Sequence, residues 1–100
     1  MQWQKIMKKI VYTPHLVFRL KFREIPYTLP KEIYQSSKEH YFDGATLRKI
    51  AVKKIKFKNR LREMAVVYEE TEQEIHIITV HPLKNYQKKS RVNSGRWQKI

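Results

Sequence analysis

The chain has 100 residues and a formal net charge of +13, from 22 Lys and Arg against 9 Asp and Glu. This length accommodates one small domain with a buried core but not two. The absence of cysteine excludes disulfides and thiolate sites, and the apolar stretches are far too short to span a bilayer. The N-terminal lysines interrupt any apolar core of a signal peptide, so we expect a single cytoplasmic domain over residues 1–100.

The first twelve residues are ambiguous. The spacing of Ile6, Met7 and Ile10 allows a turn of helix, whereas residues 9–12 suit a short strand, and we favour a strand near Ile10. Thr13 and Pro14 then form a typical helix start, with Thr as the N-cap. This helix is expected to end near Arg23, because Pro26 disfavours helical geometry in the residue before it.

The first helix is predicted to have one apolar side and one cationic stripe. The apolar residues expected to face the core are Leu16, Val17, Phe18, Leu20, Phe22 and Ile25. His15, Arg19 and Arg23 follow at a spacing of four residues, so they lie on one stripe of the helix. This stripe suits a phosphate-binding surface, and an ordinary solvated face explains it equally well.

A second, shorter helix and a set of strands are predicted next. Thr28 is expected to cap the helix, which ends at Ser36-Ser37. The strands expected after it cover residues 40–42, 47–57, 61–69 and 75–80. Within the second of these strands, Ile50 and Val52 share one face while Ile55 and Phe57 share the other. A β-bulge near Lys53-Lys54 would explain that change.

The last part of the chain is predicted to be a basic helix. Pro82 cannot continue a sheet ladder and suits the first position of a helix, which is expected from Leu83 to about Asn93, before Gly95. Residues 84–99 contain six cations and no acid. The sequence therefore predicts an α+β fold with two N-terminal helices, an antiparallel four-stranded meander and a basic C-terminal helix.

The charges are unevenly distributed along the chain. Eight Lys and Arg and no acid lie between residues 48 and 62, whereas four of the nine acids lie between residues 69 and 74. A basic footprint of this kind most often indicates contact with nucleic acid. A charge that merely keeps a structural domain soluble is the alternative.

Several kinds of active site are excluded or unsupported. The histidines form no HxxxH or HExxH pattern, and His76 and His81 differ in strand parity, so they are expected to face opposite sides and no metal site is predicted. With two glycines in the chain there is no phosphate-binding loop, and no GxSxG motif occurs. We expect neither a metal nor a cofactor.

Metal-free cleavage of RNA remains compatible with the residues present. His15 and His81 could carry protons near neutral pH, and cations could neutralise the phosphorane. Tyr68, Tyr86 or Trp97 could stack a base. Structural roles are open for the same residues: a histidine at a strand end is often structural, and Arg96-Trp97 could fold back over the sheet.

The order of the motifs resembles a known group. The segment from Thr13 to Pro26, TPHLVFRLKFREIP, opens a helix with a His-x-x-x-Arg pattern, and IITVHPL from Ile77 to Leu83 follows the meander. This order is similar to the BrnT-like and RelE-like toxin ribonucleases and to a related family of small basic domains. The resemblance implies a RelE- or barnase-like fold, metal-independent cleavage of RNA, often messenger RNA, and neutralisation by an antitoxin.

These expectations define a candidate site. His15 would act as acid or base, Arg19 would hold the scissile phosphate, and His81 would be a second proton carrier. The residues expected to bind RNA are Arg23, Lys53, Lys54, Lys56, Arg60, Lys84, Lys88, Arg91 and Arg96. An acidic antitoxin segment could cover this surface. The alternative is a non-catalytic RNA- or DNA-binding module that uses the same surface.

Overall fold

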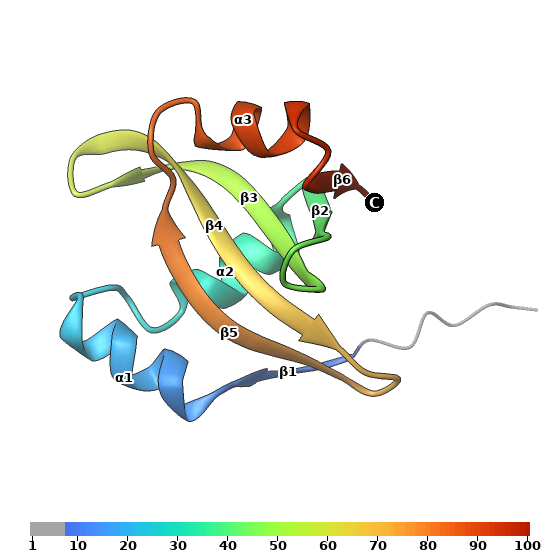
Figure 1. Cartoon of the computed structure of the whole chain (residues 1–100). Helices are drawn as coiled ribbons and strands as arrows, with labels where there is room; N and C mark the ends of the chain where they lie inside the picture. Colours follow the sequence, from blue (N-terminus) through green and yellow to red (C-terminus); the bar gives the residue numbers. More distant parts are fainter. Residues whose placement is uncertain (1–7) are drawn as a thin grey trace, which may run out of the picture.

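The computed structural model describes residues 8–100, which form one mixed sheet with helices on both of its faces (Figure 1). The elements in chain order are β1 (Lys9–Tyr12), α1 (Pro14–Phe22), α2 (Leu29–Ser36), β2 (Glu39–Asp43), β3 (Arg48–Phe57), β4 (Arg60–Glu70), β5 (Glu74–Pro82), α3 (Gln87–Asn93) and β6 (Trp97–Lys99). No helix within residues 8–100 is both long enough and apolar enough to cross a membrane.

The sheet has six strands in the order β1-β5-β4-β3-β2-β6. The strands from β2 to β5 form an antiparallel meander, β1 pairs in parallel with β5, and β6 pairs antiparallel with β2. The predicted four-stranded antiparallel sheet, with two helices as its N-terminal elements, was therefore wrong. The added strands β1 and β6 have four and three residues, which is too short for a hydrophobic periodicity to be recognised. They form because the edges of β5 and β2 offer unpaired backbone N–H and C=O groups.

The local start and stop signals placed some elements correctly. The Thr13 Oγ1 accepts a hydrogen bond from the Leu16 N–H at 3.2 Å, which confirms the predicted cap of α1. The short strand expected near Ile10 is β1, while the helical alternative involved Ile6 and Met7, which lie outside the described residues. Thr28 makes no side-chain capping bond to α2, contrary to expectation.

The basic helix begins later than expected. Pro82 is the last residue of β5 and pairs with Met64, so it ends the strand without starting a helix. The chain then turns through residues 83–86, and α3 begins at Gln87. A strand end tolerates proline because no further ladder bond is required there.

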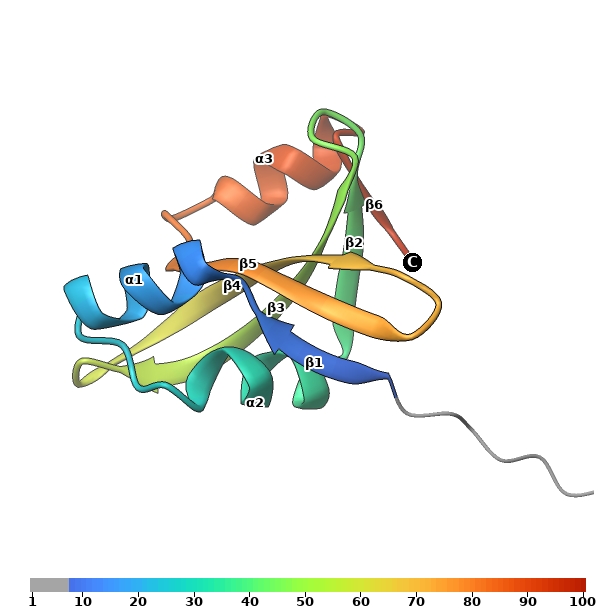
Figure 2. The ribbon, with the colours of Figure 1, turned by 90° about the horizontal axis from the view of Figure 1, so that it is seen from below.

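The two faces of the sheet carry separate cores. One core contains Leu16 and Leu20 of α1 and Ile33 of α2. The other contains Leu83 and Trp97, which flank α3 at either end. Figure 2 shows α2 and α3 on opposite sides of the sheet, with α1 beside β5.

This arrangement explains the change of apolar face in β3 without a bulge. The pairing of β3 with β4 is continuous through Lys53 and Lys54, so the predicted bulge was wrong. Ile50 and Val52 belong to the core on the α3 side, whereas Ile55 and Phe57 pack against the core on the α1 and α2 side. The first half of β3 buries its apolar residues on the α3 side and the second half buries them on the α1 and α2 side, because the helices cover different parts of the sheet.

An irregularity occurs instead between β4 and β5. Tyr68 pairs with Ile77 and Val67 with Thr79, which leaves Ile78 as an extra residue in β5. The extra residue reverses the alternation of side chains along the strand. Consequently His76 and His81 occupy the same face, and the parity-based expectation that they face opposite sides was wrong.

Candidate nucleic-acid interface

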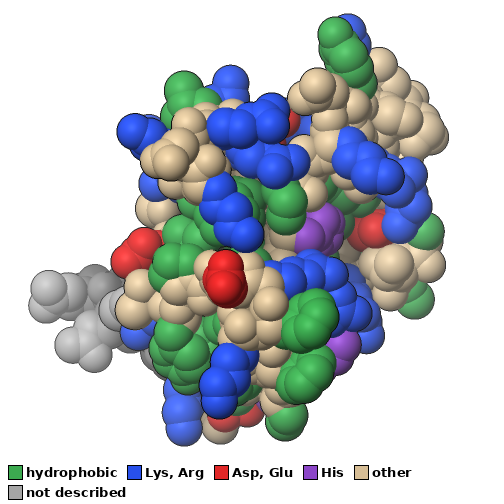
Figure 3. Space-filling model, turned by 90° about the vertical axis from the view of Figure 1, so that its left-hand side faces the viewer, with side chains coloured by type: hydrophobic (Ala, Val, Ile, Leu, Met, Phe, Trp, Pro, Cys, Tyr) green, Lys and Arg blue, Asp and Glu red, His purple; other side chains and the backbone are tan. Residues whose placement is uncertain are grey.

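Three parts of the chain lie toward the side of the molecule drawn on the left in Figure 1: α1, the turn between β3 and β4, and the chain after β5. Figure 3 faces this side. Lys and Arg side chains cover much of it, with histidine and hydrophobic side chains among them and a hollow between them. This surface is where we look for a binding site.

A pocket of about 230 Å³ lies between the start of β4 and the turn after β5. It exists because β5 ends opposite Met64, so residues 60–62 of β4 have an open edge. The Leu83 N–H donates to the Glu63 carbonyl at 2.8 Å, and the chain then turns away from the sheet. We call this pocket the cationic cleft, and its lining residues are Lys54, Arg60, Leu61, Arg62, Glu63, Leu83, Lys84, Asn85 and Tyr86.

The charges of the cleft are not compensated internally. Lys54, Arg60, Arg62 and Lys84 make no ion pair with an acidic side chain among residues 8–100. The carboxylate of Glu63, the acid in the lining, pairs with a lysine of α3. The cleft is therefore lined by four cations that make no ion pair among residues 8–100, of which Arg62 was missing from the sequence-based set. Its place within the basic segment 48–62 was the signal that pointed to it.

A second, shallower depression of about 300 Å³ lies on α1. It is lined by His15, Phe18, Arg19, Phe22 and Arg23. The predicted stripe of His15, Arg19 and Arg23 thus shares one surface. The expectation that Phe18 and Phe22 face the core was wrong, because α1 covers the edge of the sheet and buries a narrow side centred on Leu16 and Leu20.

His81 lies at the C-terminal end of β5, close in sequence to the residues that line the cleft. It is partly buried, pairs with Ala65 in β4, and lies two residues before Leu83 of the cleft. Burial lowers its pKa below the ordinary value, and the positive charge of Arg23 lowers it further. His81 is therefore neutral near neutral pH and able to accept a proton.

The structure does not bring His15 and His81 to one point. Arg23, at the C-terminal end of α1, is the residue of the stripe whose charge acts on His81. His15 lies eight residues earlier, which corresponds to about 12 Å along a helix axis. His15 is exposed at the N-terminal end of α1, with Arg19 between the two ends.

The predicted lysines of β3 divide between the two faces of the sheet. Lys54 and Lys56 are exposed on the α3 face. Lys53 lies on the opposite face, where its Nζ donates to the Ser36 Oγ at 2.7 Å at the end of α2. Lys53 is therefore engaged by the end of α2 and is not among the residues that line the cleft.

Two predicted RNA-binding cations are engaged in structural ion pairs. Lys88 of α3 pairs with Glu39 at 2.9 Å and with Glu63 at 2.5 Å. Arg96 binds both carboxylate oxygens of Asp43, at 3.0 and 3.1 Å. These contacts hold α3 and β6 against the sheet. Arg91 is partly buried in α3 and makes no ion pair among residues 8–100.

Of the three aromatic side chains considered for base stacking, Tyr86 is accessible. It is 82% exposed and has a positive φ of 66°. Tyr68 is buried, and its hydroxyl lies 2.7 Å from the His40 Nδ1. Trp97 is buried against Tyr41, with ring centroids 5.6 Å apart. Its side chain thus has a structural role, although its backbone extends the sheet as part of β6 and does not fold over it.

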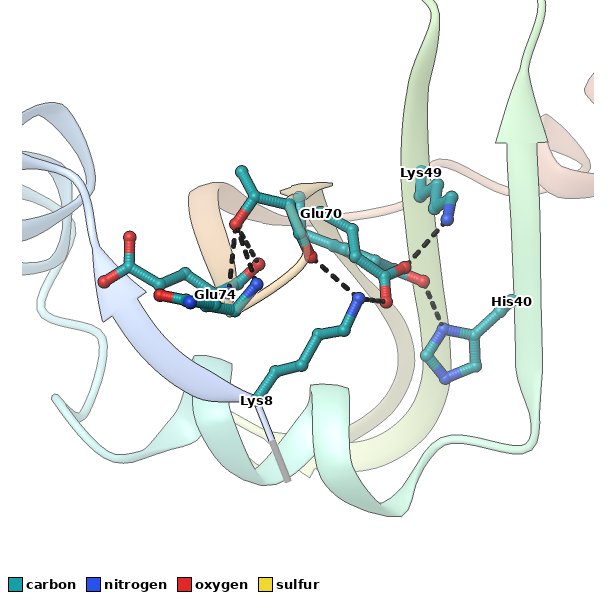
Figure 4. Close-up of polar contacts among 8 residues, drawn as sticks. Lys8, His40, Lys49, Glu70 and Glu74 are labelled. Atoms are coloured by element: carbon teal, nitrogen blue, oxygen red, sulfur yellow. Dashed lines mark hydrogen bonds and ion pairs between the residues drawn. The ribbon is translucent and has the colours of Figure 1, made fainter. Parts of the chain in front are cut away.

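The other end of β4 holds a polar network that differs in character (Figure 4). Glu70 accepts hydrogen bonds from Lys8 at 2.6 Å and Lys49 at 2.8 Å, which lower its pKa. Burial lowers the pKa of His40, which is bonded to Tyr68 nearby. Glu70 and its two lysines are therefore paired with one another, in contrast to the cations that line the cleft.

The described residues contain no cluster of three or more side chains suited to hold a metal ion. No family model, curated protein or solved structure matches the chain. A functional assignment therefore rests on the cleft and its chemistry.

Proposed function

We propose that the protein binds single-stranded RNA in the cationic cleft and cleaves it without a metal ion. The observation that supports this is the group of four uncompensated cations, Lys54, Arg60, Arg62 and Lys84, around one pocket. Phosphate oxygens are the natural ligands of such a group, and guanidinium can bind two of them at once. The exposed ring of Tyr86 at the cleft wall is suited to stack a base.

The proposed reaction uses His81 as the proton acceptor. Neutral His81 removes the proton of the RNA 2′-hydroxyl, whose oxygen attacks the adjacent phosphorus. Arg23 stabilises the negative charge that develops on the phosphorane. The bond to the 5′-oxygen breaks, this oxygen takes a proton from water, and the products are a 2′,3′-cyclic phosphate and a 5′-hydroxyl. The reaction requires a 2′-hydroxyl, so DNA is a ligand but not a substrate.

The decisive experiment measures cleavage of an end-labelled single-stranded RNA with and without a chelator. We expect chelator-resistant cleavage that falls roughly 100-fold or more in His81→Asn, because proton transfer by a positioned side chain contributes about that factor. RNA binding should be retained. The rate should rise with pH through the lowered pKa of His81, below 6.5, and then stay level to neutral pH. His76→Asn, on the same face of β5 but paired with Glu74, is the matched control.

His15→Asn distinguishes the two predicted proton carriers. The distance along α1 favours a minor role in chemistry for His15, so this variant should cleave at close to the parent rate. Cleavage lost in His15→Asn but intact in His81→Asn would move the active centre to α1 and overturn the assignment of His81.

A non-catalytic RNA- or DNA-binding module is the second candidate. The observation that favours it is that His81 makes no side-chain hydrogen bond among residues 8–100, so no partner orients its imidazole as a general base. Tight, salt-sensitive binding with no cleavage at any pH would select this candidate.

We further propose that the protein acts in the cytoplasm, where messenger RNA is available. We also propose that the same surface binds an acidic protein segment that acts as an inhibitor, as the resemblance to toxins with an antitoxin implies. The uncompensated cations of the cleft support this because an acidic chain complements them. Such a segment should compete with RNA for binding, and the competition should weaken with added salt. Simultaneous binding of RNA and inhibitor would contradict a shared surface.

A further inference from the structure

The outer side of α1 exposes two aromatic rings that belong to neither core formed by residues 8–100. Phe18 is 66% exposed and Phe22 is 78% exposed. Their rings are nearly parallel, at 12°, with centroids 6.3 Å apart. A single exposed apolar side chain needs no explanation, but two nearly parallel rings on successive turns form a contiguous apolar surface that water solvates poorly.

Cationic side chains border this aromatic surface. Arg19 and Arg23 line the same depression as the two rings, together with His15. No acidic side chain occurs within α1. Hydrophobic, histidine and cationic side chains accordingly appear side by side on the face shown in Figure 3. A ligand for this surface should carry both flat apolar groups and negative charge.

Single-stranded nucleic acid has both properties, since its bases stack on aromatic rings and its phosphates bind cations. A second copy of this chain fits less well, because each copy would bring its own Arg19 and Arg23 into a contact between two chains of net charge +13. The position of Arg23 links the depression on α1 to the region of the cationic cleft. It belongs to the depression on α1, and its charge also acts on His81 next to the cationic cleft.

We propose that Phe18 and Phe22 form a stacking platform for bases of a single-stranded RNA segment that leaves the cationic cleft and whose phosphates contact Arg19 and Arg23. This inference rests on the proposed function, because it assigns the site for the flank of the same RNA. The platform adds affinity through bases, whereas the cleft binds phosphates. Removal of the two rings should therefore lower the affinity for long RNAs that carry bases and leave the affinity for short RNAs unchanged.

The test compares two oligonucleotides by fluorescence anisotropy: a short RNA that fills the cleft, and a longer one extended at either end. A third RNA carries an extension with abasic sugars, which keeps the phosphates and lacks the bases. The variants are Phe18→Ala/Phe22→Ala, the stacking-competent Phe22→Trp, and Leu47→Ala as a control. Leu47 is 73% exposed and lies in the turn between β2 and β3.

We expect the double alanine variant to bind the extended RNA about fivefold or more weakly, since stacking of even one base contributes this much. Its affinity for the short and the abasic RNAs should match the parent. Phe22→Trp should retain the affinity, and its indole fluorescence should be quenched by the extended RNA but not by the abasic one. Leu47→Ala should match the parent throughout.

Other outcomes overturn the inference in distinguishable ways. Unchanged affinity of the double variant for the extended RNA, or an equal loss with the abasic RNA, overturns the platform and leaves the cleft intact. No binding of any RNA by the parent protein overturns the proposed function together with the platform. Concentration-dependent dimerisation of the parent that disappears in the double variant assigns the rings to self-association and also overturns the platform.

Discussion

Asp43 is buried, with 3% of its surface exposed, and its carboxylate accepts hydrogen bonds from two nitrogens, Nε and Nη2, of the Arg96 guanidinium. Burial alone would raise its pKa, but the bonds from Arg96 and the Ala45 N–H outweigh that effect and lower it from 3.8 to about 2. The folded state thus binds this proton less readily than the unfolded state. The resulting stabilisation is present above the unfolded pKa and is lost as pH falls from about 4 to about 2.

We predict that Arg96→Ala reduces the free energy of unfolding at neutral pH by about 2 kcal/mol or more, since the buried carboxylate loses its partner. The variant should also lose less stability than the parent between about pH 4 and pH 2. Urea unfolding at a series of pH values measures both effects. Arg91→Ala, which removes a cation of α3 without an ion pair, is the control. An acid transition of Arg96→Ala that parallels the parent would contradict the role assigned to this pair.

At the scale of elements, α3 is held to the sheet by a partly buried ion network more than by its own apolar residues. No residue of α3 is fully buried, although Leu83 and Trp97 on either side are. Burial lowers the pKa of Lys88, but its hydrogen bonds to Glu63 and Glu39 outweigh this, and the net pKa is raised. Lys88 thus ties α3 to both β2 and β4.

We predict that Lys88→Met loosens α3 and reduces the free energy of unfolding by about 1–3 kcal/mol, because two carboxylates that face each other lose their shared cation. Amide hydrogen exchange should accelerate in residues 87–93 before it changes in β3 and β4. Lys89→Met, at the adjacent exposed position, should leave both quantities unchanged. Equal protection of α3 in Lys88→Met and the parent would show that the flanking apolar residues suffice.

At the scale of the whole molecule, RNA affinity can come from the net charge of the protein or from the particular cations that line the cleft. Each phosphate contact on a single strand contributes about 0.7 to the slope of log affinity against log salt. Lys54→Ala/Lys84→Ala should therefore lower that slope by about 1.4. Lys31→Ala/Lys38→Ala removes the same charge from exposed positions around α2 and should leave the slope unchanged. Equal effects of both pairs would favour non-specific attraction to a basic protein.

The candidate site was only partly predictable from the residues. The basic segment 48–62 indicated cations on one hairpin, and three members of the cleft, Lys54, Arg60 and Lys84, were among the expected residues. The sequence could not separate these cations from Lys88 and Arg96, because their acidic partners lie 25 to 53 residues away in the chain. Burial of Tyr68 and exposure of Phe18 likewise depend on which side of an element faces its neighbours.

The sequence by itself determined the features that depend on neighbouring residues. These are the net charge, the helix start at Thr13-Pro14, and the strands of the meander. The alternation of apolar residues and the turn residues that define those strands lie within short stretches of the sequence. Only the tertiary structure decided the parallel pairing of β1 with β5, the addition of β6, and the set of cations that remain unpaired. The physical reason is that sheet edges and ion pairs join residues distant in the chain, and the pattern of neighbouring residues does not predict such contacts.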